Sequence, residues 1–266
     1  MKVRDKVLLI TGAGSGIGRE VARNVISKGA RVAGIDLAPQ SLEGTGALAG
    51  DTRLFAGFVA DITKRDAVEA LPELVIQRFG GIDGVINNAG VIQPFRRLAD
   101  LEYPAIERVL NVNLYGTLFV TKAFLPYLLK RPEAHIVNVS SMGGFVPVPG
   151  QTIYCAAKAA VKLMTEGLAA ELLTTNVRVS VVLPGAVATN IRTNSGAGGP
   201  AAERGNESSK AMPAADAAEI IVHGIERDAA SIFVGRDAVF MDKLARLAPC
   251  FAARAIGKKM SALLPV

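Results

Sequence analysis

Residues 6–18 read KVLLITGAGSGIG, and this stretch decides the fold. The apolar run 6–11 is typical of a buried strand, and residues 17–27 have the period of a helix. Between them, glycines at 12, 16 and 18 let the backbone turn tightly and approach a pyrophosphate at the helix N-terminus. A phosphate loop of nucleotide hydrolases is excluded, because no Lys-Ser or Lys-Thr pair follows the glycines. The stretch therefore predicts a strand, a dinucleotide-binding turn and a helix.

The alternation of strand and helix continues along the chain. Strand-like runs follow at 31–36, 54–59, 82–87, 135–140, 178–183 and 231–234. Helical periods at 64–79, 101–129, 152–173 and 214–227 lie between them. The strands are continuous apolar runs, which is typical of a parallel sheet covered by helices on both faces. We therefore predict an α/β fold with one doubly wound domain over residues 1–266.

Two stretches interrupt this alternation. Residues 193–210 (TNSGAGGPAAERGNESSK) are rich in Gly, Ser and charge and have no apolar period, which is typical of a disordered loop or a functional lid. Residues 237–260 read as two short amphipathic helices broken at Pro249. We therefore predict a substrate lid at about 190–212 and a helical C-terminal extension at about 237–266.

Composition narrows the functional class. Half of the 266 residues are apolar, yet no run reaches the ~18 apolar residues of a membrane span. Cys155 and Cys250 are too few for a disulfide framework or a metal cluster, so we predict a reducing, cytoplasmic setting. The net charge is +6, but the basic residues are dispersed, and we predict no nucleic-acid partner.

The end of the chain is locally basic. No acidic residue follows Asp242, whereas five cations do: Lys243, Arg246, Arg254, Lys258 and Lys259. A basic amphipathic pattern permits contact with a membrane surface. We favour packing of this segment over the active-site mouth or against a partner subunit.

The end of the second strand indicates the cofactor. Asp36 follows the glycine turn at the spacing of an acid that accepts hydrogen bonds from adenosine ribose hydroxyls and repels a 2′-phosphate. Neither Ser15 nor Leu37 is basic, so no side chain at those positions would form an ion pair with the 2′-phosphate. The pattern favours NAD over NADP.

Tyr154 and Lys158, in QTIYCAAK (151–158), lie four residues apart and share one face of a helix. A phenol is a weak acid, with a pKa of about 10, and a nearby ammonium favours the phenolate. The pair could therefore transfer a proton near neutral pH, although an ordinary helix produces the same spacing. His135 and His223 lie on a predicted strand and helix, where we expect structural roles.

The order of several motifs resembles that of the classical short-chain dehydrogenases/reductases. They are TGAGSGIG (11–18), Asp61, NNAG (87–90), Asn113 in NVNLYG, Ser141 in NVSSMGG, Tyr154-x-x-x-Lys158 and PGAVAT (184–189). Taken alone, Asp61 reads as a helix cap beside Thr63, and NNAG reads as a turn. The resemblance covers about residues 5–235. It implies a Rossmann-type domain with a seven-stranded parallel sheet that transfers hydride between a nicotinamide cofactor and a carbonyl or alcohol, without a metal.

The resemblance also implies a cofactor site. The glycines would hold the pyrophosphate, Asp36 the adenosine ribose, Asp61 and Ile62 the adenine, and Thr189 the nicotinamide end. The full set of implied contacts with NAD is Gly12, Ser15, Gly16, Ile17, Gly18, Asp36, Leu37, Asp61, Ile62, Asn87, Asn88, Ala89, Gly90, Tyr154, Lys158, Pro184, Gly185, Val187 and Thr189.

The catalytic group implied by the resemblance has four members. Ser141 would hydrogen-bond the substrate oxygen, and Tyr154 would exchange a proton with it. Lys158 would bind the nicotinamide ribose and lower the pKa of the tyrosine. Asn113, in a local break of its long helix, would position a water that links the lysine to solvent.

The motif spacing selects these residues over close neighbours. Ser140 or Ser141 could merely cap a turn, and only the spacing selects Ser141. Asn111 lies close to Asn113, but the VNL pattern of the family falls on residues 112–114. Substrate contacts are implied for Ser141, Gly143, Phe145, Gln151 and Tyr154. Because the segments around them are mostly apolar, we predict a hydrophobic secondary alcohol or ketone as substrate.

Two other functions stay open on the sequence. An NADP-dependent reductase of 3-oxoacyl-type ketones would use the same chemistry, and a non-catalytic dinucleotide sensor would use the same fold. The resemblance further suggests a homodimer or homotetramer assembled through the helices at 101–129 and 152–173.

Overall fold

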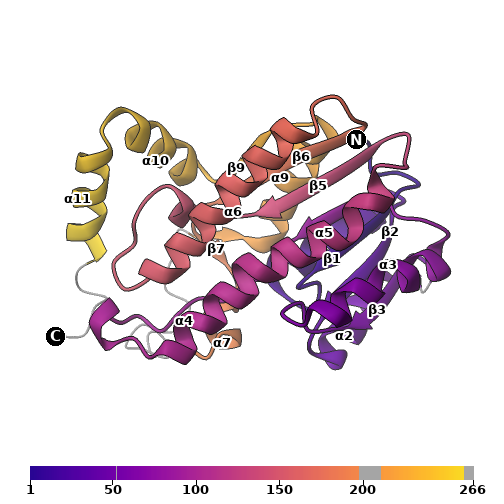
Figure 1. The fold of residues 1–266 in the computed structure, drawn as a ribbon, viewed down its shortest axis with the longest axis horizontal. Coiled ribbons are helices and arrows are strands. Elements are labelled where there is room, and N and C mark those ends of the chain that lie inside the picture. The colour runs from indigo at the N-terminus through magenta and orange to yellow at the C-terminus, as the bar shows by residue number, and fades with distance from the viewer. Residues whose placement is uncertain (52, 198–210, 261–266) are drawn as a thin grey trace.

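The computed structural model describes residues 1–51, 53–197 and 211–260 (Figure 1). Seven parallel strands form its central sheet in the order β3-β2-β1-β4-β5-β6-β9. This confirms the predicted α/β fold with a seven-stranded parallel sheet. The strands are β1 (Val7–Thr11), β2 (Arg31–Asp36), β3 (Phe55–Val59), β4 (Gly84–Asn87), β5 (Ala134–Val139), β6 (Val177–Pro184) and β9 (Ser231–Val234).

The strand order reverses beside β1, which pairs with β2 on one side and with β4 on the other. Leu9, at the middle of β1, has Ala33 and Val85 as its partners in register. At such a reversal the connections leave the sheet in opposite directions and open a crevice at the carboxyl ends of the strands. The topology therefore places a ligand site above β1 and β4.

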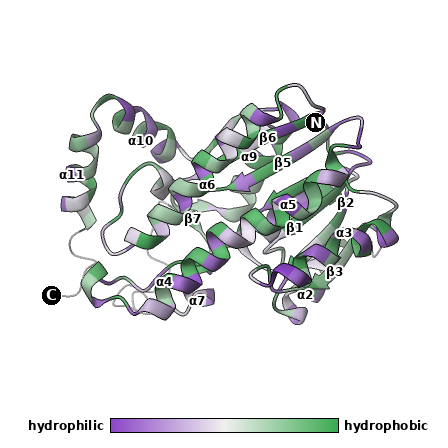
Figure 2. Ribbon diagram, in the orientation of Figure 1, coloured by the Kyte–Doolittle hydropathy of each residue, from purple (hydrophilic) through white to green (hydrophobic). Residues whose placement is uncertain are grey.

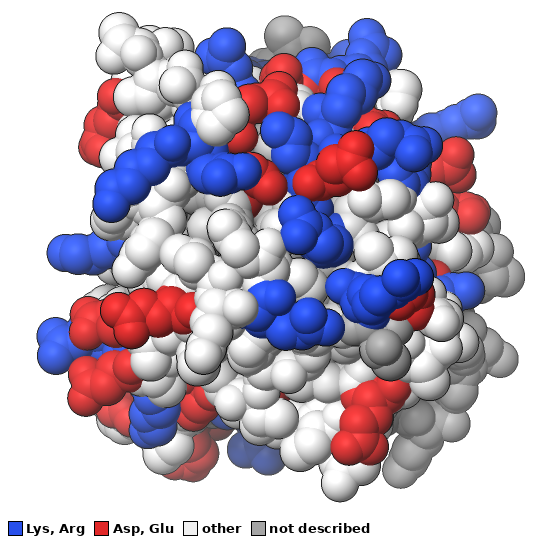
Figure 3. Space-filling view, turned by 90° about the vertical axis from the view of Figure 1, so that its right-hand side faces the viewer, with Lys and Arg blue, Asp and Glu red and all other residues white. Residues whose placement is uncertain are grey.

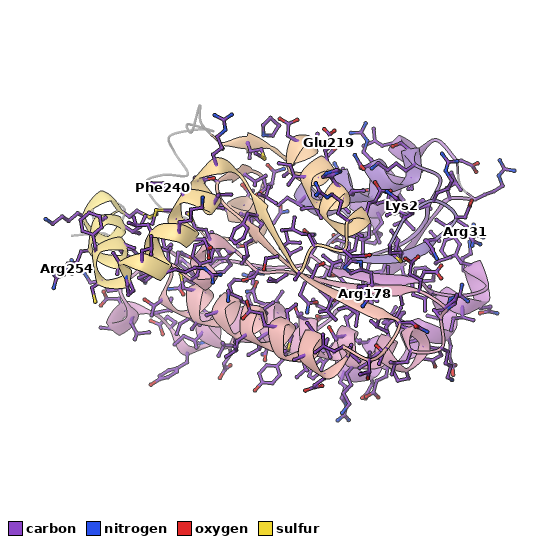
Figure 4. The ribbon with its side chains drawn as sticks, turned by 90° about the horizontal axis from the view of Figure 1, so that it is seen from above. Lys2, Arg31, Arg178, Glu219, Phe240 and Arg254 are labelled. Atoms are coloured by element: carbon purple, nitrogen blue, oxygen red, sulfur yellow. The ribbon has the colours of Figure 1, made fainter. Side chains whose placement is uncertain are left out.

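Helices cover both faces of the sheet (Figures 1 and 4). One face packs Leu8 and Ile10 against α1 (Gly16–Ser27), α2 (Pro39–Ala49) and α9 (Ala214–Glu226). The other packs Val7 and Leu9 against α3 (Arg65–Phe79), α5 (Thr117–Leu128) and the end of α6 (Thr152–Glu171). Alternate residues of β1 enter opposite cores because side chains along a strand point to opposite faces. Figure 2 shows the matching mixture of apolar and polar residues along α5 and α6.

The long helix predicted at 101–129 is interrupted. It divides into α4 (Tyr103–Leu110), a π-helical turn (Asn111–Gly116) and α5. A π-helical turn widens the backbone spiral locally and is frequent at functional sites. Asn113 lies in this turn, so the predicted local break is present at the predicted residue.

Helix α2 was not expected from the sequence. Its residues, PQSLEGTGALA, include two glycines, which have low helix propensity. Packing supplies one reason for a glycine, because a Cβ on Gly46 would lie 3.2 Å from the ring of Phe55. Pro39 begins the helix and Gly50 ends it in the left-handed conformation. The tertiary contact therefore decides an element that local propensity leaves uncertain.

The predicted C-terminal extension consists of α10 (Arg236–Leu247) and α11 (Pro249–Met260), which protrude at one end of the molecule (Figure 4). Met241 and Ala252 are buried there against Val146, in a cluster that also includes Phe145. The extension thus packs on the segment that follows Ser141. Among the described residues, no helix has both the length and the apolarity to cross a bilayer.

Three short elements follow β6 in the chain. Strands β7 (Val187–Ala188) and β8 (Met212–Pro213) pair with each other, and α7 (Ile191–Asn194) lies between them in the chain. Much of the predicted lid, at 190–212, falls on residues 198–210, which lie outside the described residues.

Candidate active site

A cavity of about 680 Å³ opens where the strand order reverses. The glycine turn, the end of β2, the NNAG turn, the segment after β5, helix α6 and the segment after β6 all line it. Most of the predicted cofactor residues meet there: Gly12, Ser15, Gly16, Ile17, Asp36, Leu37, Asp61, Ile62, Asn88, Ala89, Gly90, Tyr154, Lys158, Pro184, Gly185, Val187 and Thr189.

The glycine turn is packed so closely that side chains are excluded. Gly12 has a φ of +67°, and a Cβ there would lie 3.0 Å from the Cα of Ala89. A Cβ on Gly18 would lie 2.2 Å from the carbonyl oxygen of Gly12. Asn88 holds the turn from the opposite side, because its Nδ2 donates to the carbonyl of Thr11 at 3.0 Å. Bare backbone at a helix N-terminus is suited to a pyrophosphate.

Asp36 ties the end of β2 to this turn. Its Oδ2 accepts from the backbone N–H of Gly14 at 2.9 Å, and its Oδ1 accepts from that of Ala38 at 3.2 Å. A Cβ on Gly14 would lie 2.7 Å from Oδ2, so the carboxylate requires a glycine at this position of the turn as well. The arrangement fixes an acid at one end of the cavity.

Arg19 is a cavity residue that the sequence reasoning missed. Ser15 and Leu37 are not basic, but Arg19, on α1, lines the same cavity as these two residues. Its guanidinium donates to the carbonyl of Gly14 and to the Oγ1 of Thr45 at 3.2 Å. The arginine therefore supports the turn and the start of α2.

Asp61 forms a tight turn before α3 and does not cap that helix, whose N-cap is Lys64 with no side-chain capping hydrogen bond. Its Oδ1 accepts from the N–H of Thr63 at 2.9 Å and from the hydroxyl of Thr63 at 2.7 Å, as in a turn that leads into a helix. Asp61 and Ile62 also line the cavity. The turn thus places both residues in the lining of the cavity.

Ser141 and Tyr154 both line the cavity, and a Cβ built on Gly143 would lie 3.5 Å from the serine Oγ and 3.5 Å from the tyrosine ring. Ser141 also accepts, through its Oγ, from the backbone N–H of Gly143 at 3.0 Å. Ser140, its neighbour, is buried and donates to the carbonyl of Lys158 at 2.7 Å. The two serines therefore point to different partners, and it is Ser141 that faces the tyrosine.

The pKa values of the Tyr154–Lys158 pair differ from the expectation. Removal of its phenol from water raises the pKa of Tyr154 to about 12, against a smaller lowering effect of the hydrogen bond with Ser141. Burial likewise lowers the pKa of Lys158 to about 8. The ammonium lies 5.9 Å from the centroid of the tyrosine ring and donates to the carbonyl of Val139 at 2.9 Å. Desolvation therefore sets the direction of both shifts, and the pKa of the tyrosine is raised where a lowering by the lysine was predicted.

Asn113, in the π-helical turn, lies close to Lys158 across Gly90. Its Nδ2 donates to the carbonyls of Val91 at 2.8 Å and Val109 at 2.9 Å. Its Oδ1 is buried and has no hydrogen-bond partner among the described residues. A Cβ on Gly90 would lie 2.8 Å from this oxygen and 3.3 Å from the Nζ of Lys158. The open space at this glycine therefore lies between an unpaired acceptor and an ammonium, which suits a bridging water.

The segment after β6 closes the third side of the cavity. Pro184, Gly185, Val187 and Thr189 all line it. The N–H of Ala186 donates to Oδ2 of Asp237, in the first turn of α10, at 2.9 Å. A Cβ on Gly185 would lie 2.2 Å from the same carboxylate oxygen. The C-terminal extension thus holds this segment in place, a role that the sequence did not indicate.

Several predicted site residues do not line the cavity. Gly18 and Asn87 are packed behind it, and the Nδ2 of Asn87 donates to Thr121 at 2.9 Å and to Asn138 at 2.8 Å. This asparagine braces the sheet, because buried amides must find partners. The structure shows packing roles for these two residues, and the cofactor contacts predicted for them stay predictions.

Three predicted substrate residues also lie outside the lining of the cavity. Phe145 makes an edge contact with Phe233, with ring centroids 6.4 Å apart, and packs beside the C-terminal extension. The Nε2 of Gln151 is buried and donates to the carbonyl of Gln93 at 2.8 Å. Gly143 is buried behind Ser141. Of the five, Ser141 and Tyr154 reach the cavity.

Other lining residues went unnoticed in the sequence. Arg108 and Val112 lie one helical turn apart before Asn113, a spacing that could have marked them. The Nη1 of Arg108 donates to the carbonyl of Ser195 at 2.7 Å, next to the lid. The Nδ2 of Asn194 donates to Ser15 at 3.1 Å, so the start of the lid meets the glycine turn.

His135 has the structural role that was predicted for it. Its Nε2 shares a 2.8 Å hydrogen bond with Ser180, and only 1% of the residue is exposed. Burial is the largest cause that lowers its pKa, to about 4. Among the described residues, no group of three or more His, Cys, Asp or Glu side chains is arranged to hold a metal.

Surface charge is mixed in sign on the face shown in Figure 3. Lys and Arg side chains alternate there with Asp and Glu, and no broad area of one sign is visible. A nucleic-acid surface would gather its cations into a stripe or patch.

The chain is similar in sequence to known oxidoreductases. A family model described as short chain dehydrogenase matches residues 6–198. SadH of Mycobacterium tuberculosis, named as an oxidoreductase, is 36% identical over 261 residues, covering 91% of this chain and 90% of SadH. A protein named 3-oxoacyl-[acyl-carrier-protein] reductase FabG, from Thermotoga maritima, is 38% identical over 193 residues, covering 71% of this chain and 77% of FabG.

Solved structures show the same architecture. A short chain dehydrogenase/reductase from Burkholderia phymatum in complex with NAD superposes with a TM-score of 0.85 and 27% identity, covering 93% of this chain and 95% of that one. Levodione reductase superposes with a TM-score of 0.76 and 26% identity, covering 88% of this chain and 96% of its own.

Proposed function

This chain belongs to the short chain dehydrogenase family of oxidoreductases, and on that premise we propose that it transfers hydride between NAD and a hydrophobic secondary alcohol or ketone. The observation that carries the proposal is the convergence of Ser141, Tyr154 and Lys158 on one wall of a cavity whose far end holds Asp36. A dinucleotide extended between these two ends would bring its nicotinamide to the tyrosine.

The residues present fit a dinucleotide. The bare glycine backbone at the N-terminus of α1 would hold the pyrophosphate, and Thr189, beside Gly16, would hold the nicotinamide side. When bound, NAD would supply the hydride chemistry, whereas the protein supplies position and proton transfer.

In this proposal Tyr154 and Ser141 bind the substrate oxygen together. With its pKa raised to about 12, Tyr154 stays protonated at neutral pH and can donate its proton to a ketone oxygen. Ser141 stabilises the negative charge that develops on that oxygen. Lys158 and Asn113, on either side of the space at Gly90, would hold the water through which the tyrosine is reprotonated.

Asp36 supports NAD over NADP. Its carboxylate is fixed by two backbone N–H groups at the adenosine end of the cavity. A 2′-phosphate placed there would meet a like charge at close range, whereas ribose hydroxyls would find an acceptor. The solved structure from Burkholderia phymatum, at 27% identity, holds NAD.

A hydrophobic substrate is supported by apolar residues of the cavity lining. Among them are Val91, Val112 and Ile191. Arg108 lines it as well, but its guanidinium donates to the backbone of Ser195 at 2.7 Å. The apolar walls suit a hydrocarbon body next to the reacting oxygen.

A second candidate function is an NADP-dependent reductase of 3-oxoacyl-type ketones. It is favoured by the likeness to FabG of Thermotoga maritima, at 38% identity. Turnover of a 3-oxoacyl thioester with NADPH, at a higher kcat/KM than any simple ketone with NADH, would establish it in place of the first.

We also propose a cytoplasmic homodimer or homotetramer. Both cysteines are free, which fits a reducing setting. Large apolar side chains are exposed on the helices predicted to pair, including Tyr115 and Leu163, of which 46% and 71% are exposed. Light scattering coupled to size-exclusion chromatography would measure the assembly.

The decisive test is a screen of secondary alcohols of steroid, retinoid and aliphatic type with NAD, followed by the absorbance of NADH. We expect turnover in the wild type and none in Tyr154→Phe, although the variant binds NADH as tightly. Tight NADH binding without turnover of any alcohol or ketone would refute the enzyme and favour the dinucleotide sensor.

A further inference from the structure

Helix α6, which carries Tyr154, has no cap of its own. The first N–H groups of a helix lack intrahelical acceptors, and a side chain at the preceding position normally supplies one. Here that position is Gln151, whose side chain makes no capping hydrogen bond. The start of the helix therefore depends on an acceptor from elsewhere in the chain.

Gln93 provides this acceptor. Its Oε1 accepts from the backbone N–H of Ile153 at 2.8 Å and from that of Tyr154 at 3.1 Å. Its Nε2 donates to the carbonyl of Gly150 at 3.0 Å, and the residue is 0% exposed. A reversed amide would set its NH₂ against two N–H donors and its oxygen against a carbonyl, so the contacts allow one orientation.

The segment that carries Gln93 is tied to the rest of the site. It continues from the NNAG turn, and the carbonyl of Val91 accepts from Asn113 at 2.8 Å. The N–H of Ile92 donates to Ser195 at 3.0 Å. The carbonyl of Gln93 itself accepts from Gln151 at 2.8 Å. One short stretch thus connects the π-helical turn, the base of the lid and the N-terminus of α6.

We propose that Gln93 is a positioning residue for the proposed proton transfer, an inference that rests on the proposed function. By binding the N–H of Tyr154 itself, Gln93 fixes where the helix begins and therefore where the phenol meets Ser141. Gln93 does not line the cavity, so it acts through the tyrosine and not on the substrate. A misplacement of ~1 Å at a reacting group can cost on the order of 100-fold in rate.

Two variants of Gln93 distinguish the effect of its hydrogen-bond acceptor from the effect of its side-chain size. Gln93→Met keeps the length of the side chain but removes both polar atoms, so the N–H groups of Ile153 and Tyr154 lose their acceptor. Gln93→Glu keeps an oxygen acceptor and places its charge at a helix N-terminus, where an anion is favourable. The matched control is Thr165→Val, which removes a buried hydroxyl further along the same helix, where it accepts from Asn138 at 3.0 Å.

Four quantities are measured in each variant: amide exchange over residues 152–155, kcat for ketone reduction, its solvent deuterium isotope effect, and the Kd of NADH. For Gln93→Met we expect faster exchange, a kcat lower by ~10- to 100-fold, a larger isotope effect and an unchanged Kd. Gln93→Glu keeps the acceptor but loses the donor to the carbonyl of Gly150, so it should recover part of the kcat. Thr165→Val should leave both the kcat and the isotope effect close to those of the wild type.

Faster exchange in Gln93→Met with wild-type kcat and isotope effect would overturn the proposal, and so would an equal loss of kcat in Thr165→Val. If Gln93→Met does not fold, Gln93→Asn, whose shorter side chain withdraws the acceptor, is judged by the same criteria. Absence of turnover in the wild type would refute the proposed function, whereas unchanged exchange in Gln93→Met would refute the cap, so the two failures are distinguishable.

Discussion

The ammonium of Lys158 lies 5.9 Å from the centroid of the Tyr154 ring, and desolvation shifts the pKa values of the two groups in opposite directions. The pKa of the tyrosine is raised to about 12, and that of the lysine is lowered to about 8. At neutral pH both groups therefore hold their protons, and on alkaline titration the lysine loses its proton first.

The rate of ketone reduction should fall as the pH rises through about 8, where Lys158 becomes neutral. Below that pH the lysine is charged and Tyr154 is protonated, so kcat/KM should be level. Lys158→Arg should move the falling limb to higher pH, because a guanidinium keeps its charge. The profile of kcat/KM from pH 6 to 10 measures this. A level profile to pH 10 in the wild type would contradict the assignment.

Replacement of Asp36 by Ala should weaken NADH binding by ~10- to 100-fold, because hydrogen bonds to a charged acceptor are lost. NADPH binding should improve relative to NADH, since the repulsion of its 2′-phosphate is removed. Fluorescence titration with both cofactors measures the two Kd values. Asp66→Asn is the control, because its side chain on α3 is 94% exposed and remote from the cavity. Tighter binding of NADPH than NADH by the wild type would sink the role of Asp36.

Asp237→Ala should raise the Kd of NADH by ~3- to 10-fold, because the N–H of Ala186 loses a charged acceptor and the segment at Gly185 is released. The matched control is Asp242→Ala on the same helix, which removes an exposed pair with Arg246. Isothermal titration with NADH compares the two. Equal Kd values in both variants would show that α10 does not support the cofactor site.

Stability should fall as the pH drops from 6.5 toward 4, because of His135. Burial lowers its pKa in the folded chain to about 4, so the unfolded chain binds more protons in this window. The contribution is therefore fully present above pH 6.5 and is lost on acidification. A difference of two to three pKa units corresponds to ~3 kcal/mol. Urea unfolding at several pH values measures the free energy.

His135→Gln should remove most of this slope, whereas His223→Gln, on the exposed surface of α9, should keep it. A slope that survives in His135→Gln would assign the acid sensitivity to other groups.

Much of the fold could be predicted from local pattern. The strand Arg31–Asp36 and the last strand Ser231–Val234 have the bounds that the apolar runs indicate, because strands buried on both faces are apolar throughout. The predicted interruption near Asn113 is also present. Helix α2 escaped prediction, because its glycines weaken the local signal and its packing against Phe55 involves residues distant in sequence.

The candidate site shows the same division. Spacing placed Tyr154 and Lys158 on one helix face, since residues four apart share a face, and the order of the other motifs marked the pair as a candidate site. No motif or spacing in the sequence indicated the roles of Gln93, Arg108 and Asp237. Each acts on a backbone group far away in sequence, and a single polar residue in a loop does not reveal which distant N–H or carbonyl it meets.

The sequence by itself determined the α/β class, the glycine turn, the acid at the end of β2 and the tyrosine–lysine spacing, because each depends on neighbours within a few turns of chain. The tertiary structure decided the protonation order of Tyr154 and Lys158, since their desolvation comes from several elements at once. It also decided that Gln93 holds the start of the helix on which the tyrosine sits, because only the folded chain brings that amide within 3.1 Å of the tyrosine N–H.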